Sequence, residues 1–223
     1  RLDRNVLAPA VSKLLELTLD NFALILLFLL LGFLARRQSK FPPETPQVLN
    51  TFVLYVALPA LVLQKIPALQ FSWNLLIPAL VPWVLLLVVA GTVLLLGKLR
   101  QWPRDVIVAL LVVLPLGNTS FLGFPMTEAL FGAAWMPYAM IYDQVGSFVA
   151  LATWSTILAA VYGQNQTTVT AKAIAWRILT FPPFIALIIA LLLKNTTYPA
   201  LAQKAIDSLA LTLVPLIMFA VGF

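Results

Sequence analysis

The stretch between Val106 and Pro125 constrains the fold most, because it interrupts an apolar run before that run can cross a membrane. Residues 106–116 are almost entirely apolar, and as a helix they would span only about half of a roughly 30 Å hydrocarbon core. Pro115-Leu-Gly-Asn-Thr-Ser-Phe-Leu-Gly-Phe-Pro125 follows, with two prolines, two glycines and three small polar residues. We expect residues 117–124 to be non-helical, with helix resuming at about Pro125, because proline suits the first turn of a helix.

A break at this depth has a physical cost. Backbone groups without partners cost several kcal/mol each in hydrocarbon, so irregular chain persists there only where it is buried in protein or lines a watery cavity. In secondary transporters, broken helices of this kind hold the substrate, with half-helix ends directed at it. The sequence therefore predicts a substrate site at the break.

Composition places the break in a membrane protein. Of the 223 residues, 62% are hydrophobic and 10% are charged, which excludes an ordinary soluble domain. The chain has no cysteine and no histidine, so disulfides, thiolate nucleophiles and the usual metal and imidazole chemistry are absent. The net charge of +6 comes from basic residues clustered between apolar runs, as in membrane loops, which argues against nucleic-acid binding. We expect an all-α polytopic membrane protein with no metal site, no cofactor and no enzymatic activity.

The apolar runs predict about seven transmembrane helices, the fourth of them broken at a crossover. Lys and Arg gather after the first, third and fifth runs, so the positive-inside rule places these loops in the cytoplasm and the N-terminus outside it. We expect the plasma (inner) membrane as the location. The predicted spans are residues 14–35, 46–65, 73–97, 106–131, 135–162, 177–193 and 200–223.

The second and seventh spans resemble each other. Val53-Leu-Tyr-Val-Ala-Leu-Pro59-Ala-Leu-Val-Leu matches Leu209-Ala-Leu-Thr-Leu-Val-Pro215-Leu-Ile-Met-Phe at an offset of 156 residues. Five spans precede the repeat point, and an odd number inverts the second copy in the membrane. We therefore expect an N-terminal tail at residues 1–13, a complete five-helix repeat at 14–163, and the first two helices of an inverted second repeat at 164–223.

At this offset, a partner for the broken span would fall near residue 274, beyond the last residue of this chain. Three alternatives stay open: a fragment, an incompletely determined protein, or a natural short form whose site is completed by another copy.

The motif Gly117-Asn-Thr-Ser-Phe-Leu-Gly123-Phe-Pro125, followed by Ala-Leu-Phe-Gly132, resembles the fourth-helix motif of the auxin efflux carrier family, in the bile acid/auxin-type transporter superfamily. Leu-Gly32-Phe-Leu-Ala-Arg36-Arg, Phe-Val-Leu-Tyr-Val-Ala-Leu-Pro59-Ala-Leu-Val and Phe-Pro-Pro183-Phe-Ile-Ala extend the resemblance from about Leu14 to the end of the chain. It implies ten helices in two inverted five-helix repeats, with helices four and nine broken and crossing at the substrate site.

The break supplies the candidate substrate residues. By resemblance, Asn118 is the polar contact at the crossover, whereas capping of freed backbone groups is the purely structural alternative for it and its neighbours. The glycines are expected to let the chain turn or let another backbone approach. Glu128 follows Pro125 by three residues, where the helix dipole favours an acid. The candidate substrate-binding residues are Gly117, Asn118, Thr119, Ser120, Gly123 and Pro125.

Asp143 and Gln144 lie about eight residues into the fifth span. Acids well inside membrane helices are rare and usually face the bundle interior, which makes Asp143 a candidate for proton or ion coupling. A structural hydrogen bond to the break is the alternative. An intramembrane aspartyl protease is excluded, because no second acid lies at comparable depth and no Gly-Xaa-Gly-Asp is present.

Two functional classes stay open. The first is a secondary transporter of the efflux permease type for a small organic anion such as a carboxylate, working by alternating access with H⁺ or Na⁺ as the candidate coupling ion. The second is a non-transporting membrane subunit or sensor that retains a carrier-like half. The lipid bilayer is a partner in either case, and a homodimer or a larger membrane complex is the candidate assembly.

Overall fold

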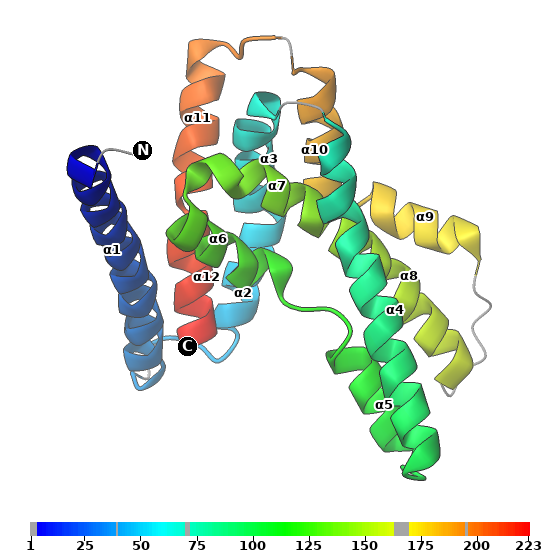
Figure 1. Cartoon of the computed structure of the whole chain (residues 1–223). Coiled ribbons are helices and arrows are strands. Elements are labelled where there is room, and N and C mark those ends of the chain that lie inside the picture. Colours follow the sequence, from blue (N-terminus) through cyan, green and yellow to red (C-terminus); the bar gives the residue numbers. More distant parts are fainter. Residues whose placement is uncertain (1–3, 39, 70–71, 163–169, 195) are drawn as a thin grey trace.

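The computed structural model describes residues 4–38, 40–69, 72–162, 170–194 and 196–223, which form helices and contain no strand (Figure 1). Three elements, η1, η4 and η6, are π-helices, and η2, η3 and η5 are 3₁₀ turns. The elements in order are α1 (Arg4–Arg36), α2 (Thr45–Phe52), η1 (Val53–Ala57), α3 (Leu58–Lys65), η2 (Ile66–Ala68), η3 (Trp73–Leu75), α4 (Leu76–Leu99), α5 (Arg104–Val113), η4 (Thr119–Gly123), α6 (Phe124–Phe131), η5 (Ala133–Trp135), α7 (Met136–Ile141), η6 (Tyr142–Ser147), α8 (Phe148–Tyr162), α9 (Ala171–Leu179), α10 (Pro182–Leu192), α11 (Ala200–Leu211) and α12 (Leu213–Gly222).

Five helical segments of the described chain are long and apolar enough to cross a membrane, and the bent pair α9 and α10 gives a sixth candidate. The prediction of an all-α polytopic membrane protein is therefore confirmed. The one expected span that is missing from this set is the broken fourth one, whose halves α5 and α6 have only 10 and 8 residues. The five segments are Leu19–Arg36, Thr45–Lys65, Trp73–Leu99, Ala133–Tyr162 and Ala200–Gly222.

Three boundaries differ from the sequence predictions. Helix α5 ends at Val113, and helix resumes with the π-helix η4 at Thr119, so the non-helical stretch is residues 114–118 rather than 117–124. The expected sixth span, 177–193, is divided by a 69° bend ahead of Pro182, because the residue before a proline disfavours helical backbone angles. Helix α1 begins at Arg4, so most of the expected tail continues the first span as helix.

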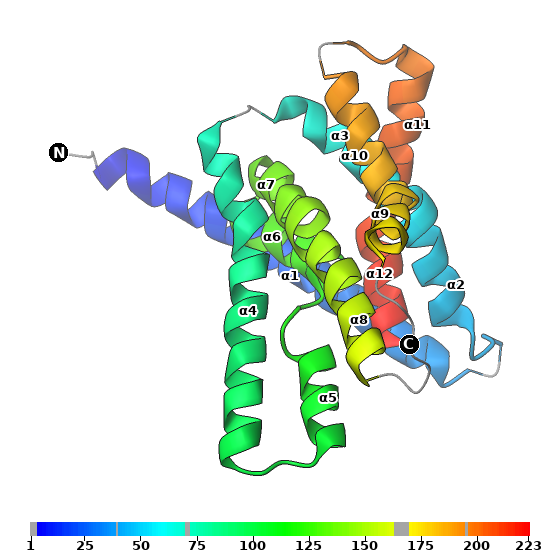
Figure 2. The same ribbon diagram turned by 90° about the vertical axis from the view of Figure 1, so that its right-hand side faces the viewer.

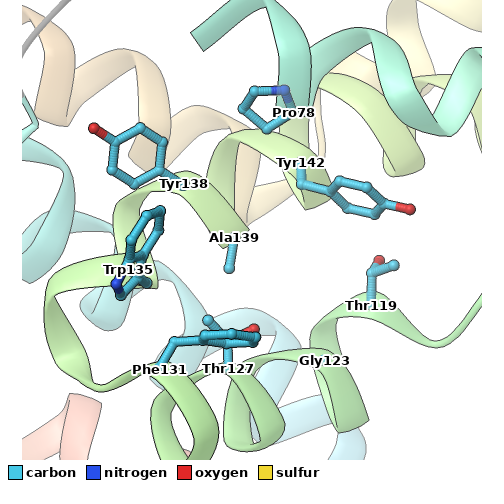
Figure 3. Close-up of a pocket in the computed structure, with 9 residues that line it drawn as sticks. All are labelled: Pro78, Thr119, Gly123, Thr127, Phe131, Trp135, Tyr138, Ala139 and Tyr142. Carbon is cyan, nitrogen blue, oxygen red and sulfur yellow. The ribbon is translucent and has the colours of Figure 1, made fainter. Parts of the chain in front are cut away.

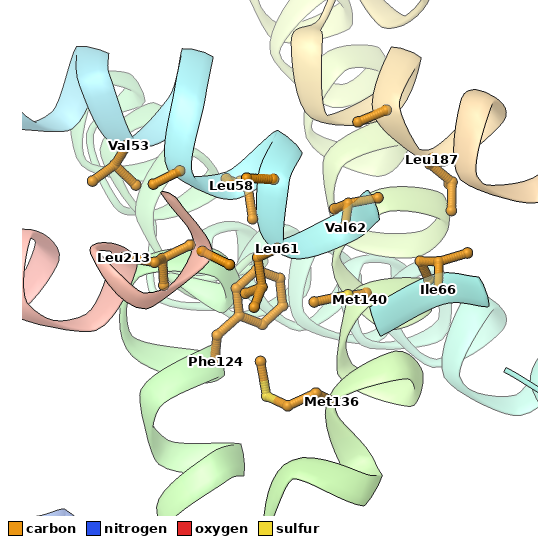
Figure 4. Packing of buried hydrophobic residues seen from close by; sticks show 14 of the residues in the cluster. Val53, Leu58, Leu61, Val62, Ile66, Phe124, Met136, Met140, Leu187 and Leu213 are labelled. Atoms are coloured by element: carbon orange, nitrogen blue, oxygen red, sulfur yellow. The ribbon is translucent and has the colours of Figure 1, made fainter. Parts of the chain in front are cut away.

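Two clusters of buried apolar side chains hold the helices together. The larger joins α1, α3, α6, α7, α10 and α12, and in it Phe124 of α6 lies near Leu61 of α3 and Leu213 of α12 (Figure 4). The smaller joins α4, α5 and α8 around Leu111 and Leu158. Helices α4 and α5 extend from the rest of the molecule as a hairpin, with α8 beside them (Figure 2). The break therefore connects a helix of the smaller cluster to a helix of the larger one.

Two pairs of helices approach each other most closely at glycines. A Cβ atom on Gly32 of α1 would lie 2.1 Å from the Phe219 carbonyl oxygen of α12, and a Cβ on Gly222 would lie 2.0 Å from that of Leu29. In η6, a Cβ on Gly146 would lie 2.6 Å from the Pro82 side chain and 2.9 Å from the Ala79 carbonyl oxygen of α4. Only glycine permits these backbone approaches, and small residues serve this purpose between membrane helices.

The antiparallel segments α2–α3 and α11–α12 are also linked by polar groups. Asp207 Oδ1 of α11 accepts hydrogen bonds from Gln64 Nε2 of α3 at 2.7 Å and from Gln203 Nε2 at 2.8 Å. The α1–α2 and α4–α5 connections, which carry basic residues, lie at one end of the molecule, and the α3–α4 and α10–α11 connections lie at the other (Figure 1). This arrangement agrees with the alternation of loops expected from the charge pattern.

Candidate functional site

Asp143 ties the broken segment to the next span. Its Oδ1 accepts hydrogen bonds from Thr119 Oγ1 at 2.5 Å and from Ser120 Oγ at 2.7 Å. The side chain is 3% exposed and lies in η6, inside the apolar segment Ala133–Tyr162. The structural hydrogen bond that the sequence offered as an alternative is therefore present. It does not exclude ion coupling, because the same carboxylate remains an ionisable group at membrane depth.

Gln144 completes the contacts of the carboxylate and has an unpaired atom of its own. Its Nε2 donates to Asp143 Oδ2 at 2.6 Å, and its Oε1 is buried with no hydrogen-bond partner among the described residues. Asp143 forms no ion pair with a described cation, and three neutral donors surround it. A buried carboxylate without a counter-charge is costly, so a proton or a small cation would stabilise it.

Asn118 caps the resumed helix. Its Oδ1 accepts a hydrogen bond from the Phe121 N–H at 3.0 Å, and its backbone carbonyl accepts from the Gly123 N–H at 3.1 Å, five residues on. This is the structural role expected of asparagine at a helix start. The side chain is nevertheless exposed, and its amide nitrogen has no partner among the described residues, so it can also donate to a ligand.

A cavity of about 320 Å³ lies beside the break, and all three π-helices contribute to it. Leu54 comes from η1, Thr119 to Phe121 from η4, and Asp143 and Ser147 from η6. Wide turns of this type occur frequently at functional sites, because the extra residue frees backbone groups and redirects side chains. The other lining residues are Leu116, Gly117, Asn118, Phe148, Leu151 and Phe181.

A second cavity, of about 510 Å³, lies along η4, α6 and α7 (Figure 3). Thr119 and Tyr142 stand at one end of it and Phe131 and Trp135 at the other, with Tyr138 above them. Thr119 lines both cavities, so the hydroxyl that bonds Asp143 stands at the boundary between them. The second cavity is mainly aromatic and carries no charged side chain.

The remaining sequence candidates have simpler positions. Gly123 has helical backbone angles, φ −62° and ψ −43°, and a Cβ atom there would make only ordinary contacts at 3.8 Å. The expectation that Gly123 is needed for a turn or a close approach is therefore wrong within this chain. Gly117 is exposed and lines the smaller cavity. Pro125 lies in the first turn of α6, as expected, and is buried, but it does not line the cavity beside the break.

Sequence reasoning missed several residues of the smaller cavity. Ser147 is 5% exposed and follows Asp143 by four residues, so helical spacing alone could have placed it on the same face. Phe148 and Phe181 stack at 3.9 Å between ring centroids, and both line the cavity. No local pattern links Leu54 or Phe181 to the break, because both come from distant spans.

Comparison with known proteins identifies the family. A family model described as "Membrane transport protein" matches residues 18–223. The chain belongs to this family. The match confirms the resemblance carried by the motif around Asn118 and agrees with the apolar helices in making the chain an integral membrane protein.

Two curated relatives are similar to this chain over most of its length. An uncharacterized transporter of Methanocaldococcus jannaschii is 26% identical over 214 residues, covering 92% of this chain and 68% of the relative. An uncharacterized transporter of Methanothermobacter thermautotrophicus is 24% identical over 208 residues, covering 89% and 65%. The chain therefore spans about two thirds of the length of these relatives.

Proposed function

We propose that this chain is the crossover-bearing part of a secondary transporter that moves a small organic anion, such as a carboxylate, by alternating access around the break. The observation that carries the proposal is the cavity beside the break. Asn118 and the buried Asp143 line it together with residues of all three π-helices. Family membership supports a transport role, and irregular backbone that lines a cavity at membrane depth supports a substrate site.

Electrostatics determine how an anion could enter this cavity. Asp143 faces it as a carboxylate with no cationic partner among the described residues, so a substrate anion would be repelled while Asp143 is ionised. Binding of a proton or Na⁺ at Asp143 and Gln144 removes that repulsion. The coupling ion and the anion would then bind cooperatively, since each lowers the cost of binding the other.

The proposed arrangement in the membrane follows the charge pattern. The N-terminus lies outside the cytoplasm, the basic loops lie within it, and the plasma membrane is the location. Residues 14–163 act as the first five-helix repeat and residues 164–223 as the start of its inverted counterpart. Helices α5 and α6 then meet at the crossover around which access alternates.

The test is uptake of radiolabelled acetate, lactate and succinate by the full-length protein in liposomes, under imposed H⁺ or Na⁺ gradients. We expect one gradient to drive uptake of at least one of these anions, and Asp143→Asn to abolish that dependence. Asp20→Asn, at an exposed acid of α1, is the matched control and should leave uptake unchanged. Uptake of none of the three anions under either gradient would refute the proposed substrate class, and a gradient response retained in Asp143→Asn would refute the coupling role.

A further inference from the structure

A third cavity, of about 370 Å³, lies on the side of α6 opposite the aromatic cavity. Four polar side chains reach it from three helices: Asn21 from α1, Gln64 and Lys65 from α3, and Glu128 from α6. Lys65 and Glu128 are each half-buried. This cavity therefore contains one side chain of each charge, unlike the two cavities described above.

The helical period of α6 separates this cavity from the aromatic one. Gly123, Thr127 and Phe131, spaced by four residues, face the aromatic cavity. Phe124 and Glu128, also four residues apart, face the third cavity. No residue lines both this cavity and either of the other two, so the charged cavity is a separate place in the molecule.

Lys65 and Glu128 are not neutralised by the protein. Neither forms an ion pair or a hydrogen bond with another residue that the structure describes. Gln64 is already engaged with Asp207, whereas the Asn21 amide has no described partner. Charges that are half-buried and unpaired keep a solvation cost that a ligand of complementary charge can remove.

We propose that this cavity binds a small zwitterion, one primary ammonium and one acidic group on an aliphatic body. Lys65 would hold the acidic group and Glu128 the ammonium, since both side chains line the cavity and they form no ion pair with each other. A ligand with a carboxylate alone would place a second anion beside Glu128, and an amine alone would place a second cation beside Lys65. The body of the ligand fits the aliphatic lining, which includes Leu24, Ile25, Leu61, Leu213 and Val214.

Leucine is the probe, with two analogues that each lack one charge: 4-methylpentanoate and 3-methylbutylamine. Binding is measured by calorimetric titration of the full-length protein in detergent without added lipid. We expect leucine to bind about tenfold or more tightly than either analogue, because each charge-assisted contact is worth roughly that factor.

Variants separate the two charges. Lys65→Gln should weaken leucine about tenfold or more and improve binding of the amine, while Glu128→Gln should weaken leucine similarly and improve binding of the carboxylate. Lys65→Glu combined with Glu128→Lys should recover leucine binding relative to either charge-reversal alone. Lys204→Gln and Glu44→Gln, at exposed positions outside the cavity, are the controls. Asp143→Asn should keep leucine binding, which distinguishes this site from the proposed crossover site.

Phosphatidylethanolamine carries the same two charges on an aliphatic body, so a second arm identifies the source of the zwitterion. Protein in nanodiscs with and without this lipid is titrated with leucine, and retained lipid is counted by native mass spectrometry. If leucine binds in both kinds of nanodisc, the ligand of the cavity is a free amino acid. If lipid is retained and its retention depends on Lys65 and Glu128, the ligand is the lipid headgroup. The proposal is overturned if neither ligand responds to the two variants, or if 4-methylpentanoate binds the unmodified protein as tightly as leucine.

Discussion

Replacing Asp143 by alanine and by asparagine separates its hydrogen bonds from its charge. In Asp143→Ala, the Thr119 and Ser120 hydroxyls and the Gln144 amide lose their shared acceptor. A buried donor without a partner costs about 1–3 kcal/mol, and the two hydroxyls can turn partly toward backbone carbonyls. We therefore expect Asp143→Ala to lower the free energy of unfolding by about 3–5 kcal/mol.

Asp143→Asn should be far milder. The asparagine Oδ1 can still accept from both hydroxyls, and rotating the Gln144 amide by half a turn directs its unpaired Oε1 at the new N–H group. The Gln144 Nε2 then takes the buried position that Oε1 had, so one atom of this amide is unpaired before and after the change, and we expect a loss of about 1 kcal/mol or less. The assay is unfolding of the purified protein in mixed detergent micelles, followed by circular dichroism.

A double-mutant cycle checks that the loss belongs to this network. Ser120→Ala combined with Asp143→Ala should give a coupling energy of about 1–2 kcal/mol, because both single variants remove the same hydrogen bond. Ser208→Ala, at an exposed hydroxyl that bonds the Lys204 carbonyl, should change stability by less than about 0.5 kcal/mol. Equal destabilisation by Asp143→Asn and Asp143→Ala would refute the reasoning. It would mean that stability depends on the negative charge of Asp143, paired with a bound cation, and not on its hydrogen bonds.

Three further predictions address packing and topology. Gly146→Val should destabilise the protein strongly, because even its Cβ would collide with α4. Gly91→Val, in open space on α4, should be tolerated, and thermal unfolding of the two purified variants compares them. Asp207→Ala should cost about 1–2 kcal/mol in the micelle unfolding assay, because two amides of α3 and α11 lose their acceptor; no change would mean that the link does not stabilise the pair. Single cysteines can be introduced at Gln38 and Thr196, because the chain has none of its own. The cysteine at 38 should react with impermeant reagents only from the cytoplasmic side and the one at 196 only from the opposite side, and the reverse pattern would overturn the orientation.

Much of the fold could be predicted from the sequence, because the thickness of the bilayer sets how long an apolar helix must be to cross it. Pro115 and the residues after it predict the break, and Asp143 is a candidate because an acid inside an apolar run needs a partner. The contact between Asp143 and the break was one of two stated alternatives. Its presence in the structure leaves ion coupling as a prediction for experiment.

The features that sequence reasoning missed depend on tertiary packing. A π-helix and an α-helix have nearly the same local preferences, so nothing in residues 119–123 revealed that the chain resumes as a wide turn rather than staying irregular. The meeting of Asn21, Lys65 and Glu128 in one cavity involves three helices far apart in the chain. The bend ahead of Pro182 is different, since its signal was local and the long apolar run obscured it.

The three π-helices around the smaller cavity have a mechanical consequence. A π turn contains one residue more than an α turn can hold, and moving that residue along the helix rotates the intervening side chains by about 100° while nearly every backbone hydrogen bond re-forms. Leu54, Thr119 and Asp143 each lie in such a turn. The helices that line the cavity can therefore reorient their side chains within the membrane, while their backbone N–H and C=O groups stay hydrogen-bonded.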